Sequence, residues 1–330
     1  MHSQDPLLDI QNLSTFFHTE ENIVRSVRNV DLTIYPGETV ALVGESGCGK
    51  SVTALSAMRL VPMPPGNFEN GRILFKGKDL LQASELEMQK IRGNEIGMIF
   101  QEPMTSLNPI FTIGDQIIEA ICLHQDKSHD EARILALKVL KKVAMPSPET
   151  RIDQYPHELS GGMKQRVMIA MSIACKPSLL IADEPTTALD VTIQAQILDL
   201  LDELRKETQM SILLITHNLG IVAQYADRVA VMYSGKIVEL ASVENIFASP
   251  SHPYTKGLLN SLPKDTISVK LETIPGAVPH PAFLPEGCAF HPRCAEKMGE
   301  CEREIPELQS LDSNSKHQTA CWLYNKTPAL

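Results

Sequence analysis

Residues 44–51 combine side chains and backbone that could bind a phosphate group. The stretch reads Gly-Glu-Ser-Gly-Cys-Gly-Lys-Ser, with four residues between its first and last glycine. Glycines let the backbone turn tightly, so that its N–H groups converge on an anion. Lys50 would then bind the β- and γ-phosphates of a nucleotide, and the Ser51 hydroxyl a Mg²⁺ ion. The alternative is an ordinary glycine-rich turn, but we predict a purine nucleoside triphosphate site at residues Gly44, Glu45, Ser46, Gly47, Cys48, Gly49, Lys50, Ser51 and Val52.

Two adjacent carboxylates follow a second apolar stretch. Residues 179–182 read Leu-Leu-Ile-Ala, and Asp183, Glu184 and Pro185 come next. At the end of a buried strand, Asp183 could hold Mg²⁺ through water, and Glu184 could act as general base or position the attacking water. The alternative is a pair of acidic caps at a strand end, because Pro185 favours a sharp turn in either case.

Four further positions are ambiguous when taken singly. Gln101 and His217 each end an apolar strand pattern, and a lone His there is more often structural. The carboxyl ends of strands in a parallel sheet are, however, where ligands bind. Ser160 precedes two glycines and an apolar helix, which alone indicates a capped helix. Phe17 lies on a strand pattern, and by spacing alone it is more often a core residue than a base-stacking one.

The elements that would position these residues can be assigned from hydrophobic periodicity. Residues 39–43 form a buried strand, followed by a helix from Val52 to Leu60 that Pro62 and Pro64 stop. Alternation over residues 7–42 and 66–100 predicts short antiparallel strands around a polar helix. We also predict helical segments at 112–145, 167–175, 191–206 and 219–225, and a hairpin at 228–239 with its turn at Ser234-Gly235.

Composition narrows the class of protein. The chain has 330 residues, 43% hydrophobic and 21% charged, with a formal net charge of −10. This charge argues against nucleic acid or an anionic lipid surface as the main partner. No apolar run is long enough to span a membrane, and the N-terminus lacks an apolar signal segment. We therefore expect a cytosolic chain whose seven Cys are reduced or metal-bound.

The last 80 residues differ in composition. From residue 249 prolines are frequent, and the chain carries four clustered thiols at Cys288, Cys294, Cys301 and Cys321. Structural zinc sites usually use Cys in close pairs, which are missing here, whereas four separately held thiolates suit the corners of an iron–sulfur cubane. We predict a [4Fe–4S] cluster, with Zn²⁺ as the alternative metal and four free thiols as the alternative without metal.

Taken in order, the motifs resemble one family, the ATP-binding-cassette ATPase subunits, over about residues 7–245. Residues 44–51 match its Walker A loop, and Asp183 and Glu184 its Walker B element. Gln101 matches the Q-loop, Ser160 with Gly161 and Gly162 the LSGGQ element, and Asp190 the D-loop. His217 matches the switch histidine, and Phe17 the base-stacking aromatic. The fifth residue of the LSGGQ element is Met163 here, but its Ser and glycines are intact.

This resemblance implies a fold and a division of roles. The fold is α/β: a RecA-like parallel sheet core with an antiparallel β subdomain and a helical subdomain at about 105–165. The ATPase domain would cover residues 1–248, and a Pro/Cys-rich extension residues 249–330. Mg²⁺ would be held by Ser51, Gln101 and Asp183, and hydrolysis assisted by Glu184, His217 and Gln101. Ser160, Gly161, Gly162 and Asp190 would act on the ATP of a second cassette bound head to tail.

Longer stretches narrow the resemblance to oligopeptide and dipeptide importers. They are residues 100–109 (FQEPMTSLNP), 182–196, the His252-Pro253-Tyr254-Thr255 element and the Cys-bearing tail. The tail of that subfamily also points to a [4Fe–4S] cluster. The resemblance implies a transport-coupled ATPase, peripheral on the cytoplasmic face of the membrane. Its partners would be a second cassette, expected to be a paralogue, two transmembrane permease subunits and an extracytoplasmic binding protein.

Other functions stay open at this stage. A related importer for nickel or another small solute would carry the same motifs. A soluble cassette ATPase commonly has two cassettes or long coiled-coil insertions, and this chain shows one set of motifs and no heptads. The peptide-importer stretches disfavour an exporter. A module that binds ATP without turnover is disfavoured because Glu184 and His217 are both present.

Overall fold

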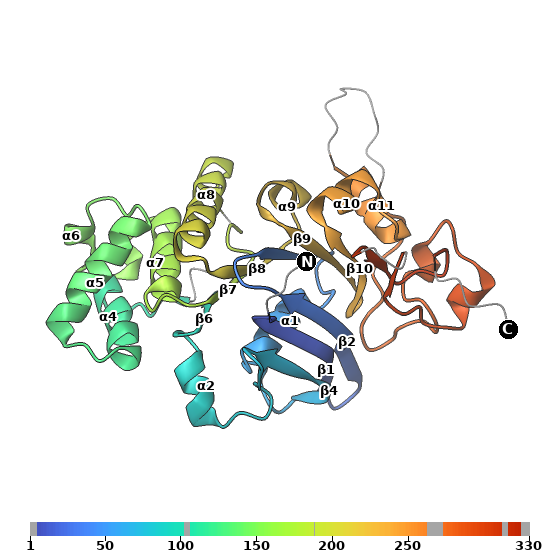
Figure 1. Ribbon diagram of the computed structural model, residues 1–330, viewed down its shortest axis with the longest axis horizontal. Coiled ribbons are helices and arrows are strands. Elements are labelled where there is room, and N and C mark those ends of the chain that lie inside the picture. Colours follow the sequence, from blue (N-terminus) through green and yellow to red (C-terminus); the bar gives the residue numbers. More distant parts are fainter. Residues whose placement is uncertain (1–4, 102–105, 188, 263–272, 312–315, 325–330) are drawn as a thin grey trace. The chain divides into compact units, whose positions relative to one another are not determined.

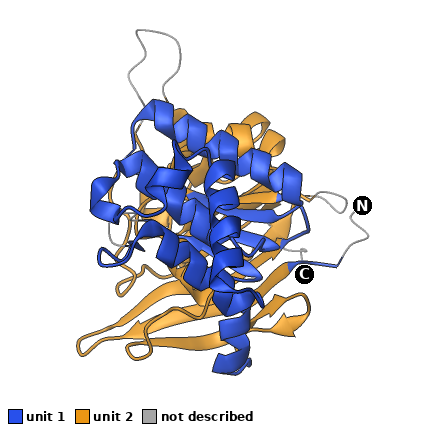
Figure 2. Ribbon diagram, turned by 90° about the vertical axis from the view of Figure 1, so that its left-hand side faces the viewer, with its two compact units in different colours: residues 1–7, 34–38, 82–215 blue, residues 8–33, 39–81, 216–330 orange. Residues whose placement is uncertain are grey.

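The computed structural model describes residues 5–101, 106–187, 189–262, 273–311 and 316–324. The chain forms two compact units, coloured separately in Figure 2. Unit 1 combines residues 1–7, 34–38 and 82–215, and unit 2 combines residues 8–33, 39–81 and 216–330. Residues 102–105 and 188, which belong to the stretches resembling peptide importers, lie outside the described residues.

An antiparallel sheet occupies the first part of unit 2. Its strand order is β2-β1-β4-β5, and β1 pairs with β4 from Leu8 opposite Phe75 to Phe17 opposite Gly66. The sequence predicts this sheet because apolar residues alternate, and the inward-facing Val27, Val30 and Leu32 of β2 are buried. The strands are β1 (Leu8–His18), β2 (Ile23–Ile34), β4 (Gly66–Phe75) and β5 (Lys78–Asp79).

The rest of unit 2 is built on a mixed run of strands in the order β11-β12-β10-β9-β3, of which β9 and β10 are labelled next to each other in Figure 1. Strand β3 is buried along its whole length and runs parallel to β9, while β9 and β10 form the predicted antiparallel hairpin. The strands are β3 (Thr39–Val43), β9 (Arg228–Tyr233), β10 (Lys236–Ser242), β11 (Gln309–Ser310) and β12 (Gln318–Thr319). The helices are α1 (Lys50–Ala57), α9 (Leu219–Tyr225), α10 (Val243–Ala248), α11 (Pro253–Asn260), η2 (His291–Arg293) and η3 (Gly299–Glu302).

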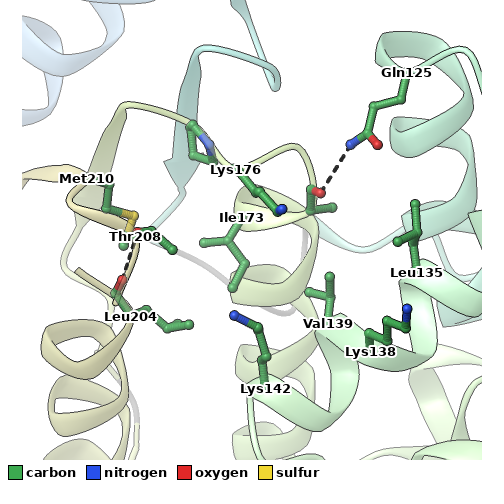
Figure 3. A pocket seen from close by; sticks show the side chains of 12 residues that line it. Gln125, Leu135, Lys138, Val139, Lys142, Ile173, Lys176, Leu204, Thr208 and Met210 are labelled. Carbon is green, nitrogen blue, oxygen red and sulfur yellow. Dashed lines mark hydrogen bonds between the residues drawn. The ribbon is translucent and has the colours of Figure 1, made fainter. Parts of the chain in front are cut away.

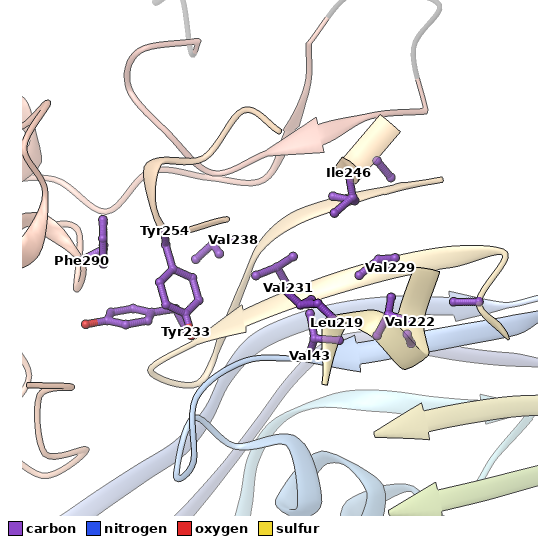
Figure 4. Packing of buried hydrophobic residues seen from close by; sticks show 13 residues of the cluster. Val43, Leu219, Val222, Val229, Val231, Tyr233, Val238, Ile246, Tyr254 and Phe290 are labelled. Atoms are coloured by element: carbon purple, nitrogen blue, oxygen red, sulfur yellow. The ribbon is translucent and has the colours of Figure 1, made fainter. Parts of the chain in front are cut away.

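One hydrophobic core joins the C-terminal extension to strand β3. Val43 of β3 and Val231 of β9 lie in the same buried cluster as Tyr254 of α11 and Phe290 (Figure 4). The rings of Tyr233, Tyr254 and Phe290 pack with centroids 4.6 to 5.5 Å apart. The described part of the extension is therefore a packed portion of unit 2, although its sequence shows little regular periodicity.

Unit 1 contains parallel strands in the order β8-β7-β6, with its helices before and between these strands in the sequence. Buried strand β7 pairs with both neighbours, which places the carboxyl ends of all three at one edge. Its strands are β6 (Ile96–Ile99), β7 (Leu179–Asp183) and most of β8 (Ser211–Thr216). Its helices are α2 (Glu85–Ile91), α4 (Ile113–His124), α5 (His129–Lys142), α6 (Pro148–Arg151), η1 (Pro156–Glu158), α7 (Gly161–Ile173) and α8 (Val191–Thr208).

Several helix bounds differ from the sequence-based expectation. Helix α1 ends at Ala57, before the prolines, because Arg59 adopts a left-handed conformation with φ 48°. Helix α7 begins at Gly161 and not at Val167. The predicted helical block at 112–145 is two helices, since Ser128 forms a capping box that starts a new helix there. The expected domain boundary at 248/249 stays a prediction, and the two units divide the chain at other positions.

Candidate nucleotide-binding and hydrolysis residues

The loop from β3 to α1, which we predict to bind phosphate, leads directly into a helix N-terminus. Gly49 caps α1 with φ 107°, so the helix N-terminus and its N–H groups follow the loop directly. The buried Lys50 ammonium donates to the carbonyl oxygens of Gly44 (2.8 Å) and Glu45 (3.1 Å). The lysine amine therefore lies against the loop itself, with Ser51 and Val52 next to it in the first turn of α1.

Each glycine of this loop has its own structural reason. A Cβ on Gly44 would lie 2.2 Å from the Met232 carbonyl oxygen, and one on Gly49 would lie 2.3 Å from that of Ser26. Gly47 has φ +78°, but a Cβ at this position would meet no atom within 4 Å. Gly44 and Gly49 thus allow the loop to pack on its own unit, whereas Gly47 is needed for its backbone conformation and borders open space.

Residues far along the sequence support this loop. The Gly235 N–H, in the turn between β9 and β10, donates to the Cys48 carbonyl oxygen (2.8 Å). The Glu45 N–H donates to the Tyr254 hydroxyl (2.9 Å), and the Glu45 carboxylate accepts two hydrogen bonds from Arg293 (2.8 and 3.1 Å). Sequence reasoning noticed Tyr254 only within a resemblance and missed Arg293, because nothing in the spacing of residues 45 and 293 indicates a contact.

Two predicted nucleotide contacts in unit 2 have less direct support. Phe17 is half-buried near the end of β1, opposite Gly66, where a Cβ would contact its ring at 3.4 Å. His217 is exposed directly after β8, and the next residue, Asn218, caps α9 through the Gly220 N–H. Base stacking by Phe17 and phosphate contact by His217 stay predictions.

In unit 1 the structure brings together Glu184 and Gln101, two residues predicted to assist hydrolysis. Asp183 is buried at the carboxyl end of β7, and Glu184 follows it with φ +46°. The Glu184 N–H donates to the Ile215 carbonyl oxygen (2.9 Å), which fixes this left-handed residue. The Glu184 carboxylate accepts hydrogen bonds from the Thr187 hydroxyl (2.8 Å) and the Gln101 amide (3.3 Å). A carboxylate oriented in this way suits a general base or a water-positioning group.

The residues predicted to act on a partner's nucleotide also lie together in unit 1. Ser160 caps α7 by accepting from the Met163 N–H, and Asp190 caps α8 by accepting from the Ile193 N–H. A Cβ on Gly162 would lie 3.2 Å from the Ile193 side chain, so the starts of the two helices are neighbours. The Gln165 amide further ties α7 to the Pro185 carbonyl oxygen, one residue after Glu184.

The four clustered thiols gather around one small pocket of unit 2, which His252 and His291 also line. All four are free cysteines. Burial raises the pKa of the Cys288, Cys294 and Cys321 thiols, the last to about 12. Within the described residues, no three His, Cys, Asp or Glu side chains are arranged so that they could hold a metal ion. The predicted [4Fe–4S] cluster therefore has no support from this side-chain geometry.

A separate cavity of about 300 Å³ lies among α5, α7 and α8 of unit 1 (Figure 3). Its walls are mainly apolar, and Lys138, Lys142 and Lys176 lie at its margin. The ammonium of Lys142 is paired with Glu207. None of the predicted nucleotide or hydrolysis residues lines this cavity, so its size does not identify it as the nucleotide site.

A partly exposed loop that wraps a buried lysine at a helix N-terminus, and an oriented Glu next to a buried Asp, are typical of P-loop ATPases. The family model of the ABC transporters matches residues 27–187, and that of the oligopeptide/dipeptide transporter C-terminal region matches residues 238–301. No helix within the described ranges is both long and apolar enough to cross a membrane.

Relatives extend the match to nearly the whole chain. The dipeptide transport ATP-binding protein DppD of Bacillus subtilis is 51% identical over 98% of this chain and 96% of its own. The oligopeptide transport ATP-binding protein AppD of the same organism is 51% identical over 98% of both chains. The solved dimer of the ATP-binding cassette MJ0796 with ADP and Pi is 27% identical, with a TM-score of 0.65 over 72% of this chain and 98% of that chain. The chain belongs to the ATP-binding subunits of ABC transporters and has their α/β ATPase fold.

Proposed function

We propose that this chain powers the uptake of dipeptides or oligopeptides through a membrane-embedded ABC importer. The observation that carries the proposal is the identity of about 50% to DppD and AppD over nearly the full length. The match of residues 238–301 to the oligopeptide/dipeptide transporter C-terminal region supports the same substrate class. A nickel or other small-solute importer is the alternative, because the ATPase motifs do not contact the solute.

We propose that one Mg·ATP is bound by residues 44–52 and Phe17, with Asp183 and Gln101 toward the metal. The chain's donors suit this ligand, since Ser51 and Asp183 supply the oxygens that Mg²⁺ prefers. Lys50 and the loop N–H groups would neutralise charge that develops on the transferred phosphoryl group. Glu184 would hold the attacking water, and His217 would contact the γ-phosphate.

We propose that a second cassette completes each site, head to tail. Ser160, Gly161, Gly162 and Asp190 lie at the adjacent starts of α7 and α8, where N–H groups favour an anion. In this arrangement they would contact the γ-phosphate bound by the partner's loop. ATP would then close the pair, and hydrolysis would open it.

The remaining partners follow from this function. Two permease subunits would supply the membrane path, and an extracytoplasmic binding protein would deliver the solute. The helical subdomain at about 105–165 would contact the permeases, which would place this chain on the cytoplasmic face of the membrane. The second cassette would be a paralogue. Co-purification from membranes, with every associated chain identified, tests these assignments together.

Uptake measurements separate the candidate solutes. In cells that lack this chain, uptake of labelled dipeptides and oligopeptides should be lost and restored by the parent chain. It should not be restored by Glu184→Gln, because that variant binds ATP without turning it over. If peptide uptake is unaffected while uptake of nickel is lost, the proposed substrate class is wrong and the chain serves a small-solute importer.

We propose that Cys288, Cys294, Cys301 and Cys321 hold a [4Fe–4S] cluster, with one zinc as the alternative. Four thiols around one pocket supply the right donors, although their present positions do not form a metal site. Anaerobic purification should give a brown protein with about four iron and four sulfide per chain. Cys294→Ser should remove the colour, whereas the exposed Cys122→Ser should keep it. Colourless protein with one zinc per chain would indicate a zinc site in place of the cluster. Protein without metal would indicate four free thiols.

A further inference from the structure

Arg293 lies in the C-terminal extension, yet its guanidinium is directed at the phosphate-binding loop of the same unit. Its side chain is 4% exposed, and it donates to both carboxylate oxygens of Glu45. Two parallel N–H bonds to one carboxylate fix the direction of both groups, as no single-point contact does. Glu45 is the second residue of the loop, so the orientation of the loop at its start is set by this pair.

The guanidinium is itself held in place by the extension. It donates to the Pro275 carbonyl oxygen (2.9 Å) and the Ile274 carbonyl oxygen (3.4 Å), and it lies 5.8 to 6.0 Å from the ring centres of Tyr233 and Phe290. The fifth N–H donates to the Tyr233 hydroxyl (3.4 Å). Because these contacts use the remaining donors and the flat faces of the group, Arg293 has little freedom to move away from Glu45.

Tyr254 makes a second contact from the extension to the same loop residue. Its hydroxyl accepts the Glu45 N–H at 2.9 Å, and its ring packs on Tyr233 and Phe290 in the core shown in Figure 4. Both the backbone and the side chain of Glu45 are therefore bound by residues more than 200 positions later in the sequence. A loop this rich in glycine would otherwise populate many conformations.

We propose that Arg293 and Tyr254 are positioning residues for ATP binding, which hold the phosphate-binding loop in its binding shape through Glu45. The C-terminal extension is thus a structural part of the nucleotide site. Coupling between two sites is reciprocal, so bound ATP must also stabilise the extension. The proposal concerns ATP binding alone and does not depend on which solute is transported.

The first test measures ATP affinity of the full chain for Arg293→Ala, with Arg303→Ala as the matched control. Arg303 is an exposed arginine of the same extension, and its charge acts on Glu302 and not on Glu45. We expect about tenfold weaker ATP binding for Arg293→Ala, a typical coupling between sites, and unchanged binding for Arg303→Ala. In the assembled transporter, KM for ATP should rise while kcat at saturating ATP stays near the parent value.

Three more variants separate positioning from simple charge. Glu45→Gln removes a negative charge near the phosphates, which by electrostatics alone would strengthen ATP binding. Positioning predicts that it weakens binding, and that adding Arg293→Ala causes little further loss. Arg293→Lys keeps the charge but loses the paired donors, so we expect a partial loss. Tyr254→Phe keeps the ring and removes the acceptor, and a few-fold loss is expected.

Hydrogen exchange distinguishes a positioning role of Arg293 from simple unfolding of the variant. ATP should slow exchange at residues 288–301 in the parent chain and not in Arg293→Ala, with thermal unfolding confirming that both are folded. The proposal is overturned if Arg293→Ala binds ATP as the parent does. It is equally overturned if Glu45→Gln binds ATP more tightly, because the pair would then act only as charges.

Discussion

The phosphate-binding loop in unit 2 and the hydrolysis residues in unit 1 are stabilised in different ways. On the hydrolysis side, contacts close in sequence, such as Thr187 with Glu184 and the caps formed by Ser160 and Asp190, act together with longer-range bonds to Glu184 within unit 1. The loop depends on partners far away in sequence, from Ser26 to Arg293. Local contacts form wherever the motif forms, whereas distant ones require the whole unit to be folded. The loop is therefore coupled to the C-terminal extension, whereas the placement of Glu184 depends on contacts within unit 1.

The largest expected effect comes from variants that show which ATP each region binds, this chain's own or that of the partner cassette. Lys50→Ala should abolish ATP binding at this chain's own loop, because it removes the ammonium that neutralises the phosphates. Ser160→Arg should leave that binding intact and block hydrolysis at the partner's site. Nucleotide binding by the isolated chain and ATPase rate of the complex measure the two effects. Equal loss of own-site affinity in both variants contradicts the head-to-tail arrangement.

Glu184→Gln tests the hydrolysis residues of unit 1 alone. The amide keeps the size of the side chain but cannot accept a proton, so ATP binding should persist while hydrolysis slows by a factor on the order of 10² or more. The closed dimer should accumulate, which size-exclusion chromatography with ATP can detect. Turnover close to the parent rate in the full complex would remove Glu184 from its assigned role.

Two glycines of the loop give a matched pair for its packing. Gly49→Ala forces a Cβ to within 2.3 Å of the Ser26 carbonyl oxygen at φ +107°, so the free energy of unfolding should fall by roughly 2–4 kcal/mol. Gly47→Ala has the left-handed strain without a clash and should cost about 1–2 kcal/mol. Chemical denaturation measures both, and similar costs would mean that the contact with Ser26 relaxes freely.

The smallest effect concerns pH and the extension. Burial lowers the pKa of His252 from 6.5 to about 4, with Glu239 and Lys256 acting in opposite directions on it, and its Nδ1 accepts the Tyr254 N–H. The unfolded chain therefore takes up the proton first as the pH falls. The contribution of the neutral His252 to the free energy of unfolding is complete above pH 6.5 and declines toward pH 4, with a loss of about 1 kcal/mol at pH 5.5. Unfolding at pH 7.5 and 5.5 should show this loss, and His252→Asn should reduce it.

The sequence predicts most elements near the motifs, for a physical reason. Buried strands such as β3 and β7 are continuous apolar runs, and the helix start at Asp190 has a cap that acts within three residues. These signals are local, so a single sequence contains them. The family resemblance then supplied the roles of Gln101 and His217, which spacing alone left open.

The contacts to the phosphate-binding loop that the sequence analysis missed are long-range. Nothing near Arg293 indicates that it binds Glu45, because a guanidinium between a Pro and a Cys is equally compatible with an exposed turn. The end of α1 was missed for a related reason: Arg59 adopts a positive φ that its residue type does not favour. Tertiary structure imposes both features.

The short strand β12 covers the outer side of β10, with Glu239 opposite Thr319 and Leu240 opposite Gln318. The Ala320 N–H adds a further bond to the Val238 carbonyl oxygen. Without this segment, β10 would present a row of unpaired backbone groups beside apolar side chains, and such an edge recruits strands from other molecules. Chains truncated before β12 would therefore be prone to aggregate during synthesis, even with every ATP motif present. A few residues near the C-terminus thus protect the protein against self-association.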